Sequence, residues 1–186
     1  YADVLSAANS IGQALLNGGH NAARPVAILS DNSISQALVM FGAMTVGIPV
    51  MPVSPAYSLM SQDHEKLKMV IGHNDPSVIF VDNPAPFAKA LGAIDMSDRT
   101  LVVGTPDGAP DNAVALSDWL ATVAGPAVDE AAAAITPETI GKILLTSGST
   151  GLPKGVLNSH RMMVSNQVSM AQVCPFLRDE PPVFVD

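Results

Sequence analysis

The chain has 186 residues, of which 48% are hydrophobic and 14% charged, so it is long enough to bury the core of one domain. Its 17 acidic and 9 basic residues give a formal net charge of −8, without the concentrated basic face that nucleic-acid binding requires. The longest apolar run, 37–44, is far shorter than the ~20 residues of a membrane-spanning helix, so we expect neither a nucleic-acid nor a membrane partner.

Over the first hundred residues, apolar runs of strand length alternate with segments of helical periodicity. Gly18 and Gly19 provide a stop for the first helix, and Ser33 offers a capping oxygen to the second. The strands are nearly continuous β-branched runs, which predicts an α/β fold with a parallel sheet flanked by helices on both faces. The expected helices cover 4–15, 34–46, 61–73 and 86–91, and the expected strands cover 25–30, 48–53, 78–81 and 101–103.

The segment 116–137 has a less regular pattern of apolar residues than the first hundred residues. Positions 116–123 form a short helical stretch with the single tryptophan, Trp119. Positions 125–134 are rich in Ala, Pro and Gly and are expected to form a surface connection. Thr136 and Pro137 have the pattern of a helix cap and first turn.

The most informative segment is 146–155, which reads Thr-Ser-Gly-Ser-Thr-Gly-Leu-Pro-Lys-Gly and follows a predicted strand at 143–146. Glycines allow successive main-chain N–H groups to converge on an anion, and the hydroxyls add further donors. Lys154 contributes a positive charge that suits phosphate. The loop follows the carboxyl end of its strand, where open α/β sheets bind ligands. A flexible Gly/Ser linker is the alternative, although it would need neither Pro153 nor Lys154.

This loop differs from three common motifs. A Walker A loop has Gly before its Lys and Ser or Thr after it, whereas Pro153 precedes Lys154 and Gly155 follows. A dinucleotide-binding G-x-G-x-x-G would need glycine in place of Thr150, and a nucleophile elbow G-x-S-x-G would need glycine in place of Ser147. These differences argue against a P-loop ATPase, a dehydrogenase and a serine hydrolase.

Downstream of the loop, 155–159 has strand character and Ser159 can cap a further helix. His160 could lie near a bound nucleotide or serve the start of this helix, and we favour the structural role. His64 and His73 are nine residues apart, which is not the i, i+4 spacing of paired metal ligands, so we expect both to be solvated and no metal site.

The single cysteine, Cys174, excludes a disulfide bond within the chain and is typical of a reducing compartment. Its position on the apolar stripe of the last predicted helix predicts a small core residue rather than a reactive thiol. We therefore expect a cytoplasmic protein.

The segment from Thr146 to Val156, followed by Ser159 and His160, resembles the signature of the adenylate-forming (AMP-binding) superfamily. This superfamily contains acyl- and aryl-CoA synthetases, luciferases and the adenylation domains of peptide synthetases. The resemblance extends upstream to the segments 1–5, 26–33 and 47–55. Within the superfamily, 52–60 and 136–140 look most like feruloyl-CoA synthetases.

The resemblance implies an ATP-dependent acid–CoA ligase, specifically a feruloyl- or hydroxycinnamate-CoA synthetase. Its substrates would be ATP with the Mg²⁺ that the nucleotide carries, an aromatic or acyl carboxylic acid, and CoA. The same resemblance implies that the loop binds the phosphates of ATP and that its lysine helps to neutralise them. The implied phosphate-binding residues are Thr146, Ser147, Gly148, Ser149, Thr150, Gly151, Lys154 and Gly155.

The family pattern continues with a Tyr-Gly-x-Thr-Glu type motif, a ribose-binding aspartate and a small C-terminal domain that carries the adenylation lysine. None of these occurs in this sequence. We therefore expect residues 1–186 to be a partial N-terminal, AMP-binding domain of a larger ligase, with no catalytic residue of its own and no activity alone.

Three alternatives stay open. An amino-acid-activating adenylation domain or a luciferase-like enzyme would differ in the acceptor of the adenylate. A nucleotide-binding phosphotransferase would release ADP, not AMP and pyrophosphate. A non-catalytic domain would gain no stability from ATP or phosphate.

Overall fold

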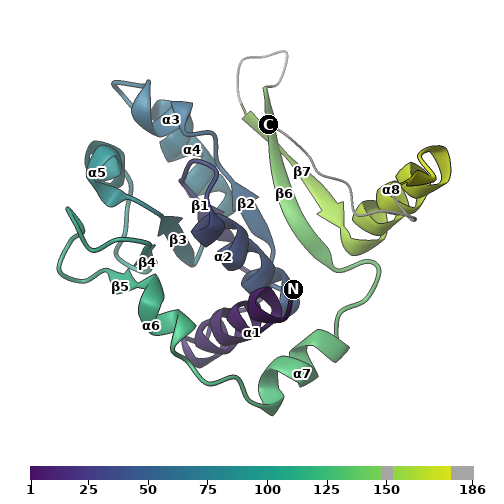
Figure 1. Cartoon of the computed structure of the whole chain (residues 1–186). Coiled ribbons are helices and arrows are strands. Elements are labelled where there is room, and N and C mark those ends of the chain that lie inside the picture. Colours follow the sequence, from purple (N-terminus) through teal and green to yellow (C-terminus); the bar gives the residue numbers. More distant parts are fainter. Residues whose placement is uncertain (148–152, 177–186) are drawn as a thin grey trace.

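The computed structural model describes residues 1–147 and 153–176, in which helices and strands alternate along the chain (Figure 1). The helices are α1 (Ala2–Asn17), α2 (Ile34–Thr45), α3 (Ala56–Leu59), α4 (Glu65–Asn74), α5 (Pro84–Gly92), α6 (Leu116–Leu120), α7 (Pro126–Ala133) and α8 (His160–Val173). The strands are β1 (Val26–Ile28), β2 (Val50–Pro52), β3 (Val78–Val81), β4 (Thr100–Val103), β5 (Val114–Ala115), β6 (Ile140–Ser147) and β7 (Pro153–Ser159).

Within the described ranges, the strands form one seven-stranded sheet in the order β5-β4-β3-β1-β2-β6-β7. All neighbouring strands pair in parallel except β6 and β7, which form an antiparallel hairpin. At the centre of the sheet, Val26 of β1 pairs with Val50 of β2 and Val78 of β3. The predicted parallel α/β fold is therefore confirmed, with β5 at one edge and the β6–β7 hairpin at the other (Figure 1).

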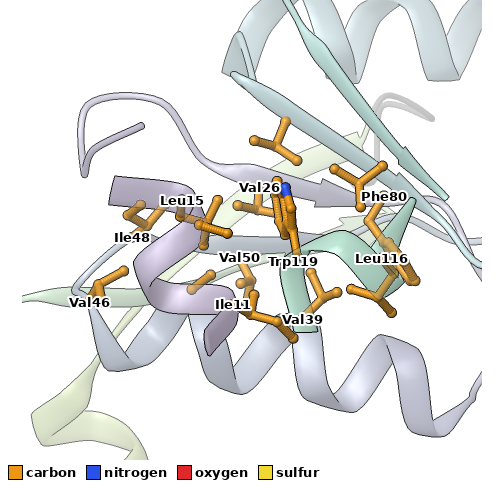
Figure 2. Close-up of a cluster of buried hydrophobic side chains, with 14 of the residues drawn as sticks. Ile11, Leu15, Val26, Val39, Val46, Ile48, Val50, Phe80, Leu116 and Trp119 are labelled. Atoms are coloured by element: carbon orange, nitrogen blue, oxygen red, sulfur yellow. The ribbon is translucent and has the colours of Figure 1, made fainter. Parts of the chain in front are cut away.

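The central strands are buried on both faces because helices cover both sides of the sheet. Val26 and Ile28 point to one face and pack with residues of α1, α2, α6 and α7, whereas Ala27 and Leu29 point to the other and pack with α4 and α5. Trp119 of α6 lies within the first of these clusters (Figure 2). Burying apolar surface on both faces is the dominant stabilisation that such strands receive.

The structure contains the predicted cap at the start of α2 and the predicted stop at the end of α1. The Ser33 hydroxyl accepts the Gln36 N–H at 3.0 Å and so caps α2. The Gly18 N–H donates to the Ala14 carbonyl at 3.0 Å and closes the last turn of α1. Each bond satisfies a main-chain group that a helix end leaves without a partner.

Two predictions for the middle of the chain are wrong. The expected surface connection at 125–134 contains helix α7, which inserts Val128 into the core at 2% exposure. The pair Thr136-Pro137 does not begin a helix, because a turn closed by the Thr139 N–H and the Thr136 carbonyl at 3.1 Å leads directly into β6. As a result β6 begins at Ile140 and is longer than predicted.

Helix α8 also differs from the expectation that it carries core residues. None of its residues is buried, and Cys174, at its C-cap, is half-buried. In the described part of the chain, the main contact of α8 is with the edge strand β7. None of the helices in residues 1–147 and 153–176 combines the length and the hydropathy needed to cross a bilayer.

Candidate phosphate-binding site

The candidate site is the connection between β6 and β7. β6 runs parallel to β2, so its carboxyl end points the same way as those of the central strands. β7 returns antiparallel, and the ladder continues to the pairs Thr146–Lys154 and Ser147–Pro153. Strand pairing therefore holds both ends of the predicted loop at the carboxyl edge of the sheet, where such folds bind ligands.

The sequence predicts eight phosphate-contacting residues, of which the structure describes Thr146, Ser147, Lys154 and Gly155. The other four, Gly148, Ser149, Thr150 and Gly151, lie outside the described residues.

Thr146 and Lys154 are directly opposite each other in the ladder, so their side chains leave the hairpin on the same face. Both are exposed. The Thr146 hydroxyl donates to the Lys154 carbonyl over a long 3.4 Å, which leaves it free to turn toward a stronger acceptor. In the part of the chain that the structure describes, Lys154 takes part in no ion pair. A hydroxyl donor and an ammonium group thus face the same side, which suits an anion.

Gly155 lies one residue beyond Lys154 and faces the opposite side of the hairpin. A Cβ at this position would lie 3.1 Å from Ile143 Cγ2 and 3.6 Å from Asn74 Oδ1. The absence of a side chain therefore allows β7 to approach both its own partner strand and α4.

The start of α8 lies at the other end of the hairpin. Ser159 accepts a main-chain N–H at 3.4 Å as an N-cap, and the His160 N–H donates to the Thr139 carbonyl at 3.0 Å. The His160 ring packs near Gly141, and its Nε2 is buried without a hydrogen-bond partner among the described residues. His160 lies six residues after Lys154, at the far end of β7, a span of roughly 20 Å, so the geometry favours the structural role for His160.

The two histidines of α4 do not share one environment. His64 is 7% exposed at the N-cap of α4, with a φ of 55° and Nδ1 3.4 Å from the Tyr57 carbonyl. The prediction that His64 is solvated is therefore wrong, because α3 folds back over the start of α4. His73 is exposed, as predicted. Among the described residues, no group of three or more His, Cys, Asp or Glu side chains could hold a metal ion.

Sequence reasoning missed the neighbour of the hairpin. The C-terminal half of α4 and the start of β7 enclose a cavity of about 430 Å³, lined by Met69, Val70, His73, Asn74, Pro153, Lys154 and Gly155. No local pattern in the sequence indicates this contact, because it joins segments about eighty residues apart.

Comparison with known proteins covers almost the whole chain. Residues 1–184 match the family "AMP-binding enzyme". The chain is 27% identical over 161 residues to the phosphinothricin tripeptide synthetase PhsC of Streptomyces viridochromogenes, covering 87% of this chain and 13% of that protein. It is 26% identical to the sulfoacetate–CoA ligase of Cupriavidus necator, covering 89% of this chain and 30% of that protein. It is also 26% identical to the L-proline–[L-prolyl-carrier protein] ligase of Streptomyces coelicolor, covering 100% of this chain and 33% of that protein.

Among solved structures, ATP-bound MatB from Rhodopseudomonas palustris has the same fold over 95% of this chain, with a TM-score of 0.68 and 22% identity. The chain spans 32% of MatB, and it spans a third or less of each of the three relatives above. The sheet topology and the extent of the family match agree with the loop signature, and the chain belongs to the AMP-binding family of adenylate-forming enzymes.

Proposed function

We propose that this chain supplies the phosphate-binding part of an AMP-forming ligase that activates a carboxylic acid with ATP. The observation that carries the proposal is the pairing of Thr146 with Lys154 at the two ends of a Gly- and Ser-rich loop, in a chain of the AMP-binding family. The chain spans only 30% of a relative such as the sulfoacetate–CoA ligase, and the proposal for this chain is confined to phosphate binding.

In the proposed reaction, a carboxylate oxygen of the acid attacks the α-phosphorus of ATP. The bond from that phosphorus to its bridging oxygen breaks, and pyrophosphate leaves with the electron pair. Negative charge accumulates on the departing phosphates, so donors that are already aimed at them lower the barrier. Lys154 neutralises part of this charge, and the hydroxyl and main-chain N–H groups of 146–151 bind the β- and γ-phosphate oxygens.

Mg²⁺ carried by the nucleotide would neutralise part of the phosphate charge. Among the described residues, the site offers the Lys154 ammonium group, which cannot bind this ion, and the Thr146 hydroxyl, which can donate to a phosphate oxygen or serve as a ligand to Mg²⁺.

The proposal extends to the identity of the acid and of the group that accepts the acyl part of the adenylate. A thiol acceptor is supported by relatives named as a CoA ligase and as a carrier-protein ligase. The resemblance of 52–60 and 136–140 to feruloyl-CoA synthetases supports a hydroxycinnamate and CoA. Relatives named as a tripeptide synthetase and as a proline ligase support an amino acid and a carrier thiol equally well.

The test is acid-dependent exchange of labelled pyrophosphate into ATP by the intact enzyme. We expect Lys154→Ala to slow this exchange on the order of 10²-fold, the loss typical of removing one donor from a site of developing negative charge. The acid that supports exchange, chosen from hydroxycinnamates, amino acids and sulfoacetate, identifies the substrate class.

Lys142→Ala is the matched control, because Lys142 lies on the same hairpin but four residues before Thr146. It removes the same charge away from the loop and is expected to leave exchange unchanged. An unaltered exchange rate in Lys154→Ala would refute the assignment. Release of ADP in place of AMP and pyrophosphate would favour a phosphotransferase.

A further inference from the structure

We propose that Asn74, at the C-terminal end of α4, is a positioning residue that sets the place of Lys154 in the phosphate site. This inference rests on the proposed function, in which Lys154 binds the phosphates of ATP. It concerns two segments that are distant in the sequence and that line the same cavity between α4 and β7.

Asn74 and Gly155 lie close to each other and line the same cavity. Asn74 Nδ2 donates to the Val70 carbonyl at 2.8 Å, which holds the amide against the last turn of its own helix. Asn74 Oδ1 lies 3.6 Å from the point that a Cβ on Gly155 would occupy. The amide therefore limits how closely β7 can approach α4, one residue after Lys154.

The C-terminal end of α4 is held in place because the next residue, Asp75, forms ion pairs with two arginines. Asp75 has a φ of 43°, in the left-handed conformation that ends many helices. Its carboxylate pairs with Arg24 Nε at 3.0 Å and with Arg99 Nη2 at 2.7 Å, and the Arg99 side chain is only 8% exposed. These bonds tie the C-terminus of α4 to the segments that enter β1 and β4.

β7 is held from its other side by β6. Ile143 Cγ2 lies 3.1 Å from the same Cβ position on Gly155, and the Thr146 hydroxyl donates to the Lys154 carbonyl. The main chain at Lys154 thus has two supports: its pairing with β6, and the Asn74 amide, which limits the approach of β7 to α4. Truncating the amide removes one of these two supports and allows β7 to move toward α4, and a displacement of about 1 Å at a site of this kind can cost up to ~10²-fold.

The experiment measures the affinities of the intact enzyme for ATP and for AMP by titration calorimetry. We expect Asn74→Ala to weaken ATP binding by about 10-fold and to leave AMP binding unchanged, because only ATP carries the phosphates that Lys154 contacts. His73→Ala is the matched control, since His73 is exposed, adjacent in the same helix and lines the same cavity. We expect it to change neither affinity. Asn74→Ser, which keeps a polar side chain, provides the same comparison if the alanine variant does not fold.

An ATP affinity that stays unchanged in the Asn74 variants, or ATP and AMP affinities that fall together, would overturn the inference. Lys154→Ala measured in parallel separates the two proposals. If Lys154→Ala weakens ATP binding and the Asn74 variants do not, the positioning role alone fails. If Lys154→Ala has no effect on ATP binding, the assignment of the phosphate site is wrong, and the positioning role of Asn74 is refuted as well.

Discussion

At the level of single residues, Gly42 lies where α1 and α2 pack closely. A Cβ on Gly42 would lie 2.5 Å from Ile11 Cγ2 and 2.6 Å from Ile11 Cβ. Ile11 is fully buried in the core and β-branched, so it cannot turn away without disturbing its neighbours. Gly72, in α4, offers the opposite case, because no atom lies within 4 Å of its Cβ position.

We expect Gly42→Ala to destabilise the chain by about 1–3 kcal/mol, the usual cost of forcing a methyl group into a packed core. Gly72→Ala should instead raise stability by about 0.5–1 kcal/mol, since alanine restricts the unfolded chain and favours the helix. The measurement is urea unfolding followed by the fluorescence of Trp119, which is 7% exposed. Equal midpoints for the two variants would show that helix propensity, and not the contact with Ile11, decides the outcome at Gly42.

At the level of elements, helices and strands could be predicted wherever an apolar pattern marks them. The central strands are continuous β-branched runs, and α1 and α2 have apolar stripes with caps at Gly18 and Ser33, so their existence and type follow from local physics. Helix α7 could not be predicted in this way, because it buries only Val128 and has no apolar stripe. The turn at 136–139 was mistaken for a helix start because a Thr-Pro pair suits both structures.

β7 and α8 bury far less apolar surface than the central strands do. On β7, Val156 is 46% exposed and Leu157 is 55% exposed, and α8 contains no buried residue. By contrast, every residue of β1 and β3 is buried. Local stability follows the apolar contacts that an element makes, so the two groups should open with very different free energies.

Native-state hydrogen exchange on the 186-residue chain tests this difference. We expect amides of α8 to exchange at least ~10²-fold faster than amides of β1 and β3, since α8 can open without exposing the core. Protection in α8 equal to that in β3 would mean that the chain unfolds as a single cooperative unit. Mass spectrometry of peptides from the two regions provides the comparison.

At the level of the whole molecule, the sequence alone could mark 146–155 as a candidate phosphate site because its donors lie within ten consecutive residues, and the site itself stays a prediction. The proximity of Asn74 to Gly155 could not be predicted, because only the packing of α4 against the sheet brings these residues together. His64 was wrongly expected to be solvated for the same reason, because its burial depends on α3. The acid remains a prediction, since the names of the relatives point to several different acids.

At the amino edge of the sheet, a cluster of polar side chains links several helices and strands. His20, after α1, lies 3.1 Å from the hydroxyl of Ser77, which precedes β3. Arg24, before β1, pairs with Asp75 and Asp98. Burial lowers the pKa of His20 below its ordinary value of 6.5, and the positive charge of Arg24 lowers this pKa further.

This shift predicts how the stability of the fold depends on pH. Because the folded state holds His20 neutral to a lower pH than the unfolded chain does, the unfolded state binds more protons below pH 6.5. The contribution of His20 to stability is therefore complete above pH 6.5 and is lost as the pH falls from 6.5 through the lower folded pKa.

We expect His20→Gln, which keeps a hydrogen-bonding side chain but cannot be protonated, to lose less free energy of unfolding between pH 8 and pH 5 than the unmodified chain. Urea unfolding at several pH values measures both curves. Because every other ionisable group is the same in both proteins, the difference between the curves reports His20 alone, and parallel curves would show that burial of this ring does not limit stability in acid.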